Sequence, residues 1–185
     1  PKLAGFVSRA RSLSEGRPIL LHCWRGGMRS ASLAWLLRTA GFQVRPLRGG
    51  YKAYRRLVLE ELTHRGELVV LGGRTGSGQT EAPRALAELG TPVIDLEGIA
   101  DHYGSAFGNL DDHPQPTNEQ FANEVHRQLR LHDAKTPIWI EDESRSIGRV
   151  WQPEEWFHRI RSGRVVVLER GLEERVRHLE QMYGS

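Results

Sequence analysis

Cysteine and long apolar runs are what this chain of 185 residues has least of. Its single cysteine, Cys23, excludes an intrachain disulfide framework and a cysteine-rich zinc site, so no metal centre is predicted on that basis. A run of about 18 apolar residues, which a membrane-spanning helix needs, does not occur. The charged fraction of 26% and the apolar fraction of 38% argue against a disordered chain. A lone thiol without a secretory signal predicts a reducing cytoplasm as the compartment.

Lysine is also scarce, with 3 residues against 23 arginines, and the charge is unevenly distributed along the chain. Residues 1–65 carry 13 basic and 3 acidic side chains, a balance of +10. Residues 66–185 carry 13 basic and 20 acidic side chains, a balance of −7. So sharp a division predicts two units, residues 1–65 and 66–185, rather than one uniform domain.

Apolar periodicity predicts that strands and helices alternate in both units. In the first unit we expect strands at 19–21 and 44–47, and helices at 31–40 and 51–62. In the second we expect strands at 68–71, 93–96, 138–140 and 165–168, helices at 80–89, 119–131, 153–161 and 172–182, and a loop over 97–117. This alternation is typical of α/β proteins with parallel sheets.

The thiol lies in a glycine-containing loop between a predicted strand and a predicted helix. Such a turn directs backbone N–H groups at one point, and the helix N-terminus adds partial positive charge, so the pKa of a thiol there is lowered. Arg29 would add a fixed charge and a two-pronged donor. We therefore expect Cys23 to be catalytic rather than a small buried apolar residue. The residues expected to cradle its anion are Trp24, Arg25, Gly26, Gly27, Met28, Arg29 and Ser30.

The spacing His-Cys-x-x-Gly-x-x-Arg-Ser at 22–30 fits two classes of enzyme. It matches the signature of Cys-dependent phosphatases, and it is similar to the loop of rhodanese-type sulfurtransferases, whose cysteine carries sulfur or selenium. A phosphatase needs a general acid for its leaving group. Glu15, Glu60 and Glu61 are the acids of the first unit, and none lies in an evident acid loop. This counts modestly against the phosphatase and leaves both classes open.

A second glycine-rich loop follows the expected strand at 68–71. Residues 73–80 fit the phosphate-loop spacing G-x-x-x-x-G-K-[ST], except that Gln79 replaces the lysine. Backbone N–H groups would still cradle a phosphate, but Gln79 lacks the charge that lysine places on the outer phosphates. We expect a weakened phosphate site, with Thr80 as a candidate magnesium contact. Its residues are Gly73, Thr75, Gly76, Ser77, Gly78, Gln79 and Thr80.

Two further groups of residues are candidate site components. At the end of the strand at 138–140, carboxylates lie where they would orient a metal, although a solvated strand end is the alternative. That group is Glu141, Asp142, Glu143, Ser144 and Arg145. In the first unit, arginine and aromatic side chains interleave, a pattern suited to RNA phosphates and unpaired bases, although a solvated arginine-rich surface is the alternative. Residues predicted to bind tRNA are Arg45, Arg48, Tyr51, Lys52, Arg55 and Arg56.

A cysteine loop followed directly by a phosphate loop resembles the tRNA 2-selenouridine synthase family. The strings that carry the resemblance are HCWRGGMRS at 22–30, LRGGYKAYR at 47–55, LGGRTGSGQT at 71–80, DLEGIADHYGSAFG at 95–108 and IWIEDESRSIGRV at 138–150. The resemblance implies part of a rhodanese-like parallel sheet unit followed by a P-loop-type three-layer α/β unit. It also implies a fragment of a longer protein.

The resemblance further implies an enzyme that replaces sulfur by selenium in the wobble 2-thiouridine of tRNA, with selenophosphate as donor. A geranylated intermediate, made from geranyl diphosphate, is associated with the family. Cys23 would be the catalytic residue, and residues 73–80 would be a candidate site for geranyl diphosphate. No tightly bound cofactor is implied, and an enzyme that supplies selenophosphate is an expected partner. A phosphatase or sulfurtransferase, and an RNA-binding fragment without catalytic activity, are the alternatives.

Overall fold

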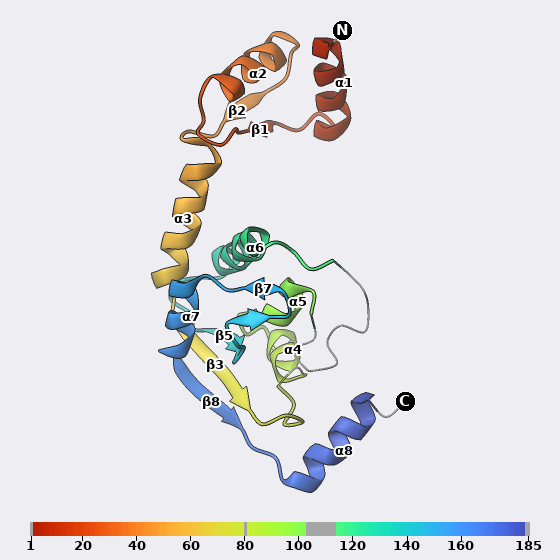
Figure 1. Ribbon diagram of the computed structural model, residues 1–185, viewed down its shortest axis with the longest axis vertical. Helices are drawn as coiled ribbons and strands as arrows, with labels where there is room; N and C mark the ends of the chain where they lie inside the picture. The colour runs from red at the N-terminus through yellow and green to blue at the C-terminus, as the bar shows by residue number, and fades with distance from the viewer. Residues whose placement is uncertain (1, 80, 103–113, 184–185) are drawn as a thin grey trace. The chain divides into compact units, whose positions relative to one another are not determined.

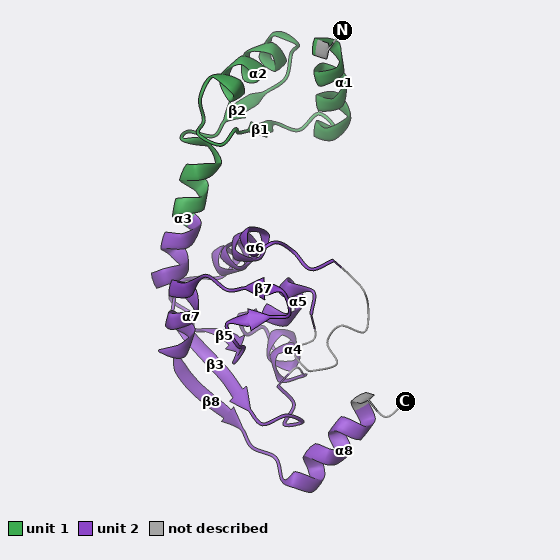
Figure 2. Cartoon of the chain, viewed as in Figure 1, with its two compact units in different colours: residues 1–57 green, residues 58–185 purple. Residues whose placement is uncertain are grey.

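The computed structural model describes residues 2–79, 81–102 and 114–183 (Figure 1). The chain is a mixed α/β protein with parallel sheets, which confirms the expected fold class. It divides into two compact units, residues 1–57 and 58–185 (Figure 2). The division falls inside helix α3 (Gly50–His64), whereas the charge pattern suggested a boundary near residue 65.

The first unit contains two short parallel strands. Its elements are α1 (Lys2–Ser14), β1 (Ile19–Leu21), α2 (Met28–Thr39), β2 (Val44–Pro46) and the beginning of α3. Ile19 lies opposite Val44 in the parallel pair. The buried core is small and consists of Ala34, Leu37 and Val44. Helix α2 begins at Met28, three residues before the predicted start, so its first turn forms part of the cysteine loop.

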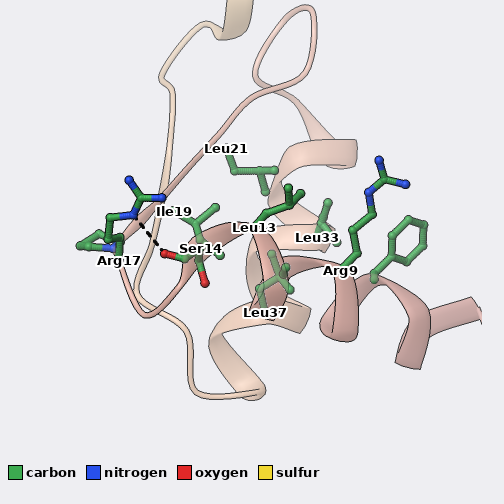
Figure 3. A pocket seen from close by; sticks show the side chains of 11 residues that line it. Arg9, Leu13, Ser14, Arg17, Ile19, Leu21, Leu33 and Leu37 are labelled. Atoms are coloured by element: carbon green, nitrogen blue, oxygen red, sulfur yellow. Dashed lines mark hydrogen bonds between the residues drawn. The ribbon is translucent and has the colours of Figure 1, made fainter.

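An apolar groove of about 400 Å³ lies beside this small core (Figure 3). Side chains of α1, β1 and α2 line it, among them Leu13, Leu21 and Leu33, and Arg17 donates to the Ser14 carbonyl at its edge. Two strands of three residues each cover too little apolar surface to close such a groove.

The second unit is built on a four-stranded parallel sheet with the order β4-β5-β3-β8. Its strands are β3 (Leu68–Gly73), β4 (Val93–Ile94), β5 (Ile138–Glu141) and β8 (Arg164–Leu168). Its helices, after the end of α3, are α4 (Glu81–Glu88), α5 (Leu96–Ala100), α6 (Asn118–Leu131), α7 (Glu154–Arg161) and α8 (Leu172–Tyr183). Because all pairings are parallel, the carboxyl ends of the strands meet at one edge, where ligands of open α/β sheets bind.

The core of the second unit contains fully buried side chains from β3, β5 and several helices, such as Val69, Ile140, Phe121 and Trp156. These positions follow the apolar runs of the sequence, and the expected strands at 68–71, 138–140 and 165–168 each form. No helix in the described ranges is long and apolar enough to cross a membrane.

Two elements differ from the sequence-based expectation. The predicted strand 93–96 ends at Ile94, and α5 occupies the beginning of the predicted loop. The reason is that the Asp95 side chain caps α5 by accepting from Gly98 N at 2.6 Å, while Leu96 and Ala100 become buried. The second difference is an antiparallel hairpin of β6 (Ser146–Ile147) and β7 (Val150–Trp151), which the sequence analysis left unassigned.

Candidate active site

The cysteine loop is held by the first turn of α3. Cys23 follows β1 by two residues, and its carbonyl accepts from Tyr51 N at 3.0 Å. The carbonyl of Trp24 accepts from Lys52 N at 2.9 Å. The first N–H groups of a helix have no partner within the helix, so α3 is free to bind these two carbonyls. The loop is thereby fixed at its beginning by backbone hydrogen bonds.

Two glycines let this loop approach α3 closely. Gly26 has φ +68° and Gly50 has φ +64°, both in the region that favours glycine. A Cβ on Gly26 would lie 2.6 Å from Gly50 N, and a Cβ on Gly50 would collide with Cys23 O and Gly26 N. The two backbones therefore touch without room for a side chain, which explains the glycines at positions 26 and 50.

The thiol of Cys23 lies in a set of hydrogen bonds at the start of α2. Its Sγ is 3.3 Å from the Oγ of buried Ser30, which also donates to Gly27 O at 2.9 Å. The Ser30 hydroxyl, then backbone N–H groups of Ser30, Gly27 and Arg25, outweigh desolvation and lower the pKa of Cys23 to about 6. The Ser30 hydroxyl can turn its proton to the sulfur once the thiol ionises. The thiolate, the reactive form of cysteine, therefore predominates at neutral pH.

The other predicted cradle residues contribute through the backbone or point to solvent. Arg29 lies in the first turn of α2, is exposed, and forms no side-chain hydrogen bond or ion pair with the described residues. Among the described residues the Ser30 hydroxyl has the largest effect on the thiol, and the two-pronged contact of Arg29 with a bound anion stays a prediction. The remaining exposed side chains of the loop are Trp24, Arg25 and Met28.

Aromatic rings gather beside the cysteine loop. Tyr51 stacks with His22 at a centroid distance of 5.8 Å, and it lies 5.7 Å from Trp24 and 6.0 Å from Tyr54. Trp24 is 53% exposed. The structure therefore brings the rings of His22, Trp24 and Tyr54 together around Tyr51. Such exposed rings suit an unpaired base.

The predicted tRNA-binding residues follow the same loop in the chain. Arg45 lies on β2, Arg48 in the turn after it, and the others on the first two turns of α3. Lys52, Arg55 and Arg56 share one side of α3 because residues three and four positions apart lie on the same face. All five basic side chains are exposed except that of Arg55, which is half-buried.

We predict that Ser30→Ala slows alkylation of Cys23. Loss of the hydroxyl removes the largest cause of the low pKa, so the pKa rises and less thiolate is present. At pH 7 the rate with iodoacetamide should fall several-fold, since each unit of pKa above the pH reduces the thiolate about tenfold. Ser32→Ala, an exposed serine of the same helix, is the matched control and should react as the unsubstituted chain does. Equal rates for the two variants would contradict this account.

The second glycine-rich loop connects β3 to α4. Ser77 N donates to Arg74 O at 2.9 Å within it. The amide of Gln79, oriented to satisfy both of its ends, donates to Gly73 O at 3.2 Å and accepts from Gly73 N at 2.9 Å. Gln79 therefore ties the end of the loop to its beginning and carries no charge. Thr80, the candidate magnesium contact, lies outside the described residues.

Helix α8 packs against the outer part of this loop. Arg175 Nε donates to Thr75 O at 2.9 Å, and Leu179 lies 3.0 Å from where a Cβ on Gly76 would stand. Ser77 and Gly78 are buried between these contacts and β3. Contact between the phosphate loop and residues after 168 is not predictable from the sequence, because nothing in the sequence shows that β8 lies next to β3.

Carboxylates collect at the same edge of the sheet. Glu141 is 4% exposed, and its Oε2 accepts from Leu96 N at 3.1 Å and Glu97 N at 3.3 Å. Burial, with the charges of Asp95 and Glu97 adding to it, raises the pKa of Glu141 to about 8. Burial, followed by the charge of Glu97, also raises the pKa of Glu143 to about 8. The two side chains therefore hold protons at neutral pH.

The neighbouring predicted residues have structural partners. Asp142 forms an ion pair with Arg161 at 2.7 Å, and Ser144 Oγ donates to Ser146 O at 2.6 Å. Arg145 pairs with Glu154 at 3.3 Å and lies over the ring of Trp151. In the part of the chain that the structure describes, no three His, Cys, Asp or Glu side chains converge to hold a metal ion. Protonated carboxyls also suit a cation poorly.

The raised pKa of Glu141 predicts a pH-dependent stability. Between pH 4.5 and about 8 the folded chain keeps a proton that the unfolded chain has lost, so stability falls as the pH rises through this range. Glu141→Gln keeps the acceptor oxygen and removes the titration. The unfolding temperature of this variant should fall less between pH 5 and pH 8, as measured by circular dichroism. Exposed Glu155→Gln is the control, and identical pH profiles for the two variants would refute the interpretation.

The fold and the site define an α/β protein in which a rhodanese-type cysteine loop precedes a P-loop-type unit. A model of the rhodanese-like domain matches residues 2–57, and a model of the tRNA 2-selenouridine synthase AAA domain matches residues 66–185. The chain belongs to the tRNA 2-selenouridine synthase family, which confirms the resemblance noted in the sequence.

Curated relatives named tRNA 2-selenouridine synthase match most of the chain. The protein of Bdellovibrio bacteriovorus is 42% identical over 180 residues, which are 92% of this chain and 46% of the relative. That of Marinobacter nauticus is 40% identical over 161 residues, 84% of this chain and 42% of the relative. That of Hydrogenovibrio crunogenus is 37% identical over 195 residues, 99% of this chain and 51% of the relative. The chain spans about half the length of these relatives.

Proposed function

We propose that this chain takes part in replacing sulfur by selenium at position 2 of the wobble uridine of tRNA, with Cys23 at the reacting centre. The observation that carries the proposal is a thiol with a pKa of about 6, held among directed N–H groups. Exposed aromatic and basic side chains of the same unit suit an unpaired base and RNA phosphates. The names of the curated relatives agree with this reaction.

In the proposed reaction selenophosphate donates selenium without a change of oxidation state. The sulfur of 2-thiouridine first takes a geranyl group from geranyl diphosphate, and diphosphate leaves. The C2–sulfur bond then breaks, and the sulfur departs with its electron pair as the geranyl thiolate, a better leaving group than sulfide. Selenium of selenophosphate forms the new bond to C2, and hydrolysis of its bond to phosphorus releases phosphate.

The residues of the first unit have three roles in this proposal. The Cys23 thiolate attacks C2 and the geranyl thiolate leaves. Selenium of selenophosphate then bonds to C2 and the Cys23 thiolate leaves, so that one substitution is divided into two easier ones. The N–H groups of the loop stabilise negative charge that develops near the sulfur. Trp24 and Tyr51 stack on the base, while the basic residues from Arg45 to Arg56 bind the RNA backbone.

The second unit contributes the phosphate loop. We propose that residues 73–80 hold the diphosphate of geranyl diphosphate, with backbone N–H groups as the main donors. We also propose an enzyme that supplies selenophosphate as a partner. The expected compartment is the cytoplasm, where tRNA is found.

Replacement of Cys23 by serine tests the function. The chain is incubated with 2-thiouridine-containing tRNA, selenophosphate and geranyl diphosphate, and the nucleosides are measured by mass spectrometry. Cys23→Ser should reduce 2-selenouridine to the level without protein, because a serine hydroxyl is not ionised at neutral pH. Ser32→Ala should leave the yield unchanged. A yield from Cys23→Ser equal to that of the unsubstituted chain would overturn the assigned role of Cys23.

The same preparations separate the two alternatives. A phosphatase would release phosphate from an aryl phosphate, and Cys23→Ser would lose this activity. Two of the three acids of the first 65 residues are engaged elsewhere, which does not favour it: Glu15 pairs with Arg17, and Glu61 pairs with His126 and Arg130. An RNA-binding fragment without catalysis would bind tRNA equally well with and without Cys23 and form no 2-selenouridine.

A further inference from the structure

The phosphate loop has Gln79 in place of the expected lysine, but an arginine from a distant part of the chain, Arg170, lies beside the loop. Arg170 follows the carboxyl end of β8, the strand that pairs with β3 along Val69–Gly73. Its guanidinium faces Gly78: a Cβ on that glycine would lie 3.3 Å from Nη2 and 3.4 Å from Cζ of Arg170. Gly78 has φ +97° and immediately precedes Gln79. A positive charge is therefore present next to the loop, and it belongs to the segment that follows β8.

This guanidinium is available for a ligand. Arg170 is exposed, and its side chain forms no hydrogen bond or ion pair with any residue that the structure describes. Two other arginines near this edge are engaged, Arg161 with Asp142 and Arg175 with Thr75 O.

A cavity of about 400 Å³ adjoins Arg170. Three arginines line it, namely Arg74 from the phosphate loop, Arg170, and Arg175 from α8. Two carboxylates line it as well, of which Glu174 accepts from Gly171 N at 3.3 Å. The formal balance of these five side chains is +1, and the guanidinium groups come from three separate elements. The cavity is thus suited to an anion with several oxygens.

A buried hydroxyl in the same loop lacks a partner. Ser77 is 3% exposed, and its Oγ forms no hydrogen bond within the described residues. The oxygen lies where a Cβ on Gly73 would stand, so it is inside the curve of the loop. A buried hydroxyl without a partner is costly, and a bound phosphate oxygen would satisfy it.

We propose that Arg170 is the cation of this phosphate site, taking the role that Gln79 cannot perform. The ligand is a diphosphate group, with loop N–H groups and Ser77 on one side and the Arg170 guanidinium on the other. Arg74 and Arg175 extend the positive surface to its outer oxygens. The inference deepens the proposed function, because it depends on a diphosphate compound being bound by the second unit.

An arginine has the chemistry to replace the missing lysine. A guanidinium offers planar pairs of N–H donors that match two phosphate oxygens, and it keeps its charge at every physiological pH. The uncharged amide of Gln79 forms hydrogen bonds with both the N–H and the carbonyl of Gly73, and these bonds hold the two ends of the loop together. In this proposal Arg170 supplies the positive charge, and Gln79 fixes the conformation of the loop.

Binding of inorganic diphosphate, measured by isothermal titration calorimetry, tests the assignment. Arg170→Gln should weaken binding at least about tenfold, the effect expected from loss of a hydrogen bond to a charged group. Arg164→Gln removes the same charge from the opposite end of β8 and should bind as the unsubstituted chain does. Gln79→Lys added to Arg170→Gln should restore most of the affinity, because the charge returns from the expected position.

Two results would overturn the assignment: no diphosphate binding by the unsubstituted chain, or equal weakening by Arg170→Gln and Arg164→Gln. Both are independent of Cys23. Diphosphate binding that depends on Arg170, together with tRNA modification that does not depend on Cys23, would refute the proposed role of Cys23 and leave that of Arg170 standing.

Discussion

The contact between the backbones of Gly26 and Gly50 is the constraint on which the cysteine loop depends. It lets the first N–H groups of α3 reach the carbonyls of Cys23 and Trp24, and so fixes the beginning of the loop. The end of the loop is fixed by α2, whose first turn contains Ser30. Held at both ends, the loop directs hydroxyl and N–H donors at one sulfur atom. The low pKa of Cys23 is therefore a consequence first of the Ser30 hydroxyl and then of the backbone N–H groups of the loop, not of nearby cationic side chains.

In the second unit, separate segments of the chain meet because the carboxyl ends of its parallel strands lie at one edge of the sheet. The phosphate loop after β3, the acidic segment after β5 and Arg170 after β8 reach this edge from separate parts of the chain. Negative charge on the β5 side is reduced, because Glu141 and Glu143 hold protons at neutral pH. On the β8 side, Arg170 has no ion-pair partner among the residues that the structure describes. The edge is therefore polarised toward binding an anion near β8.

Local sequence patterns predicted the features that depend on residues close together in the chain, namely the main strands and the cysteine loop. The apolar runs placed the main strands, and the string HCWRGGMRS located the cysteine loop together with Ser30. What the sequence could not show depends on pairing between distant segments. Helix α5 is stabilised by Glu141, more than forty residues away in the chain. Arg170 reaches the phosphate loop only because β8 pairs with β3.

The measurement that tests the account most directly is a titration of the Cys23 thiolate by its ultraviolet absorbance, with Cys23→Ser as the blank. As the single cysteine, Cys23 gives the whole signal. The account predicts a midpoint near pH 6. A midpoint near 9.0, the value of a thiol without these hydrogen bonds, would contradict it.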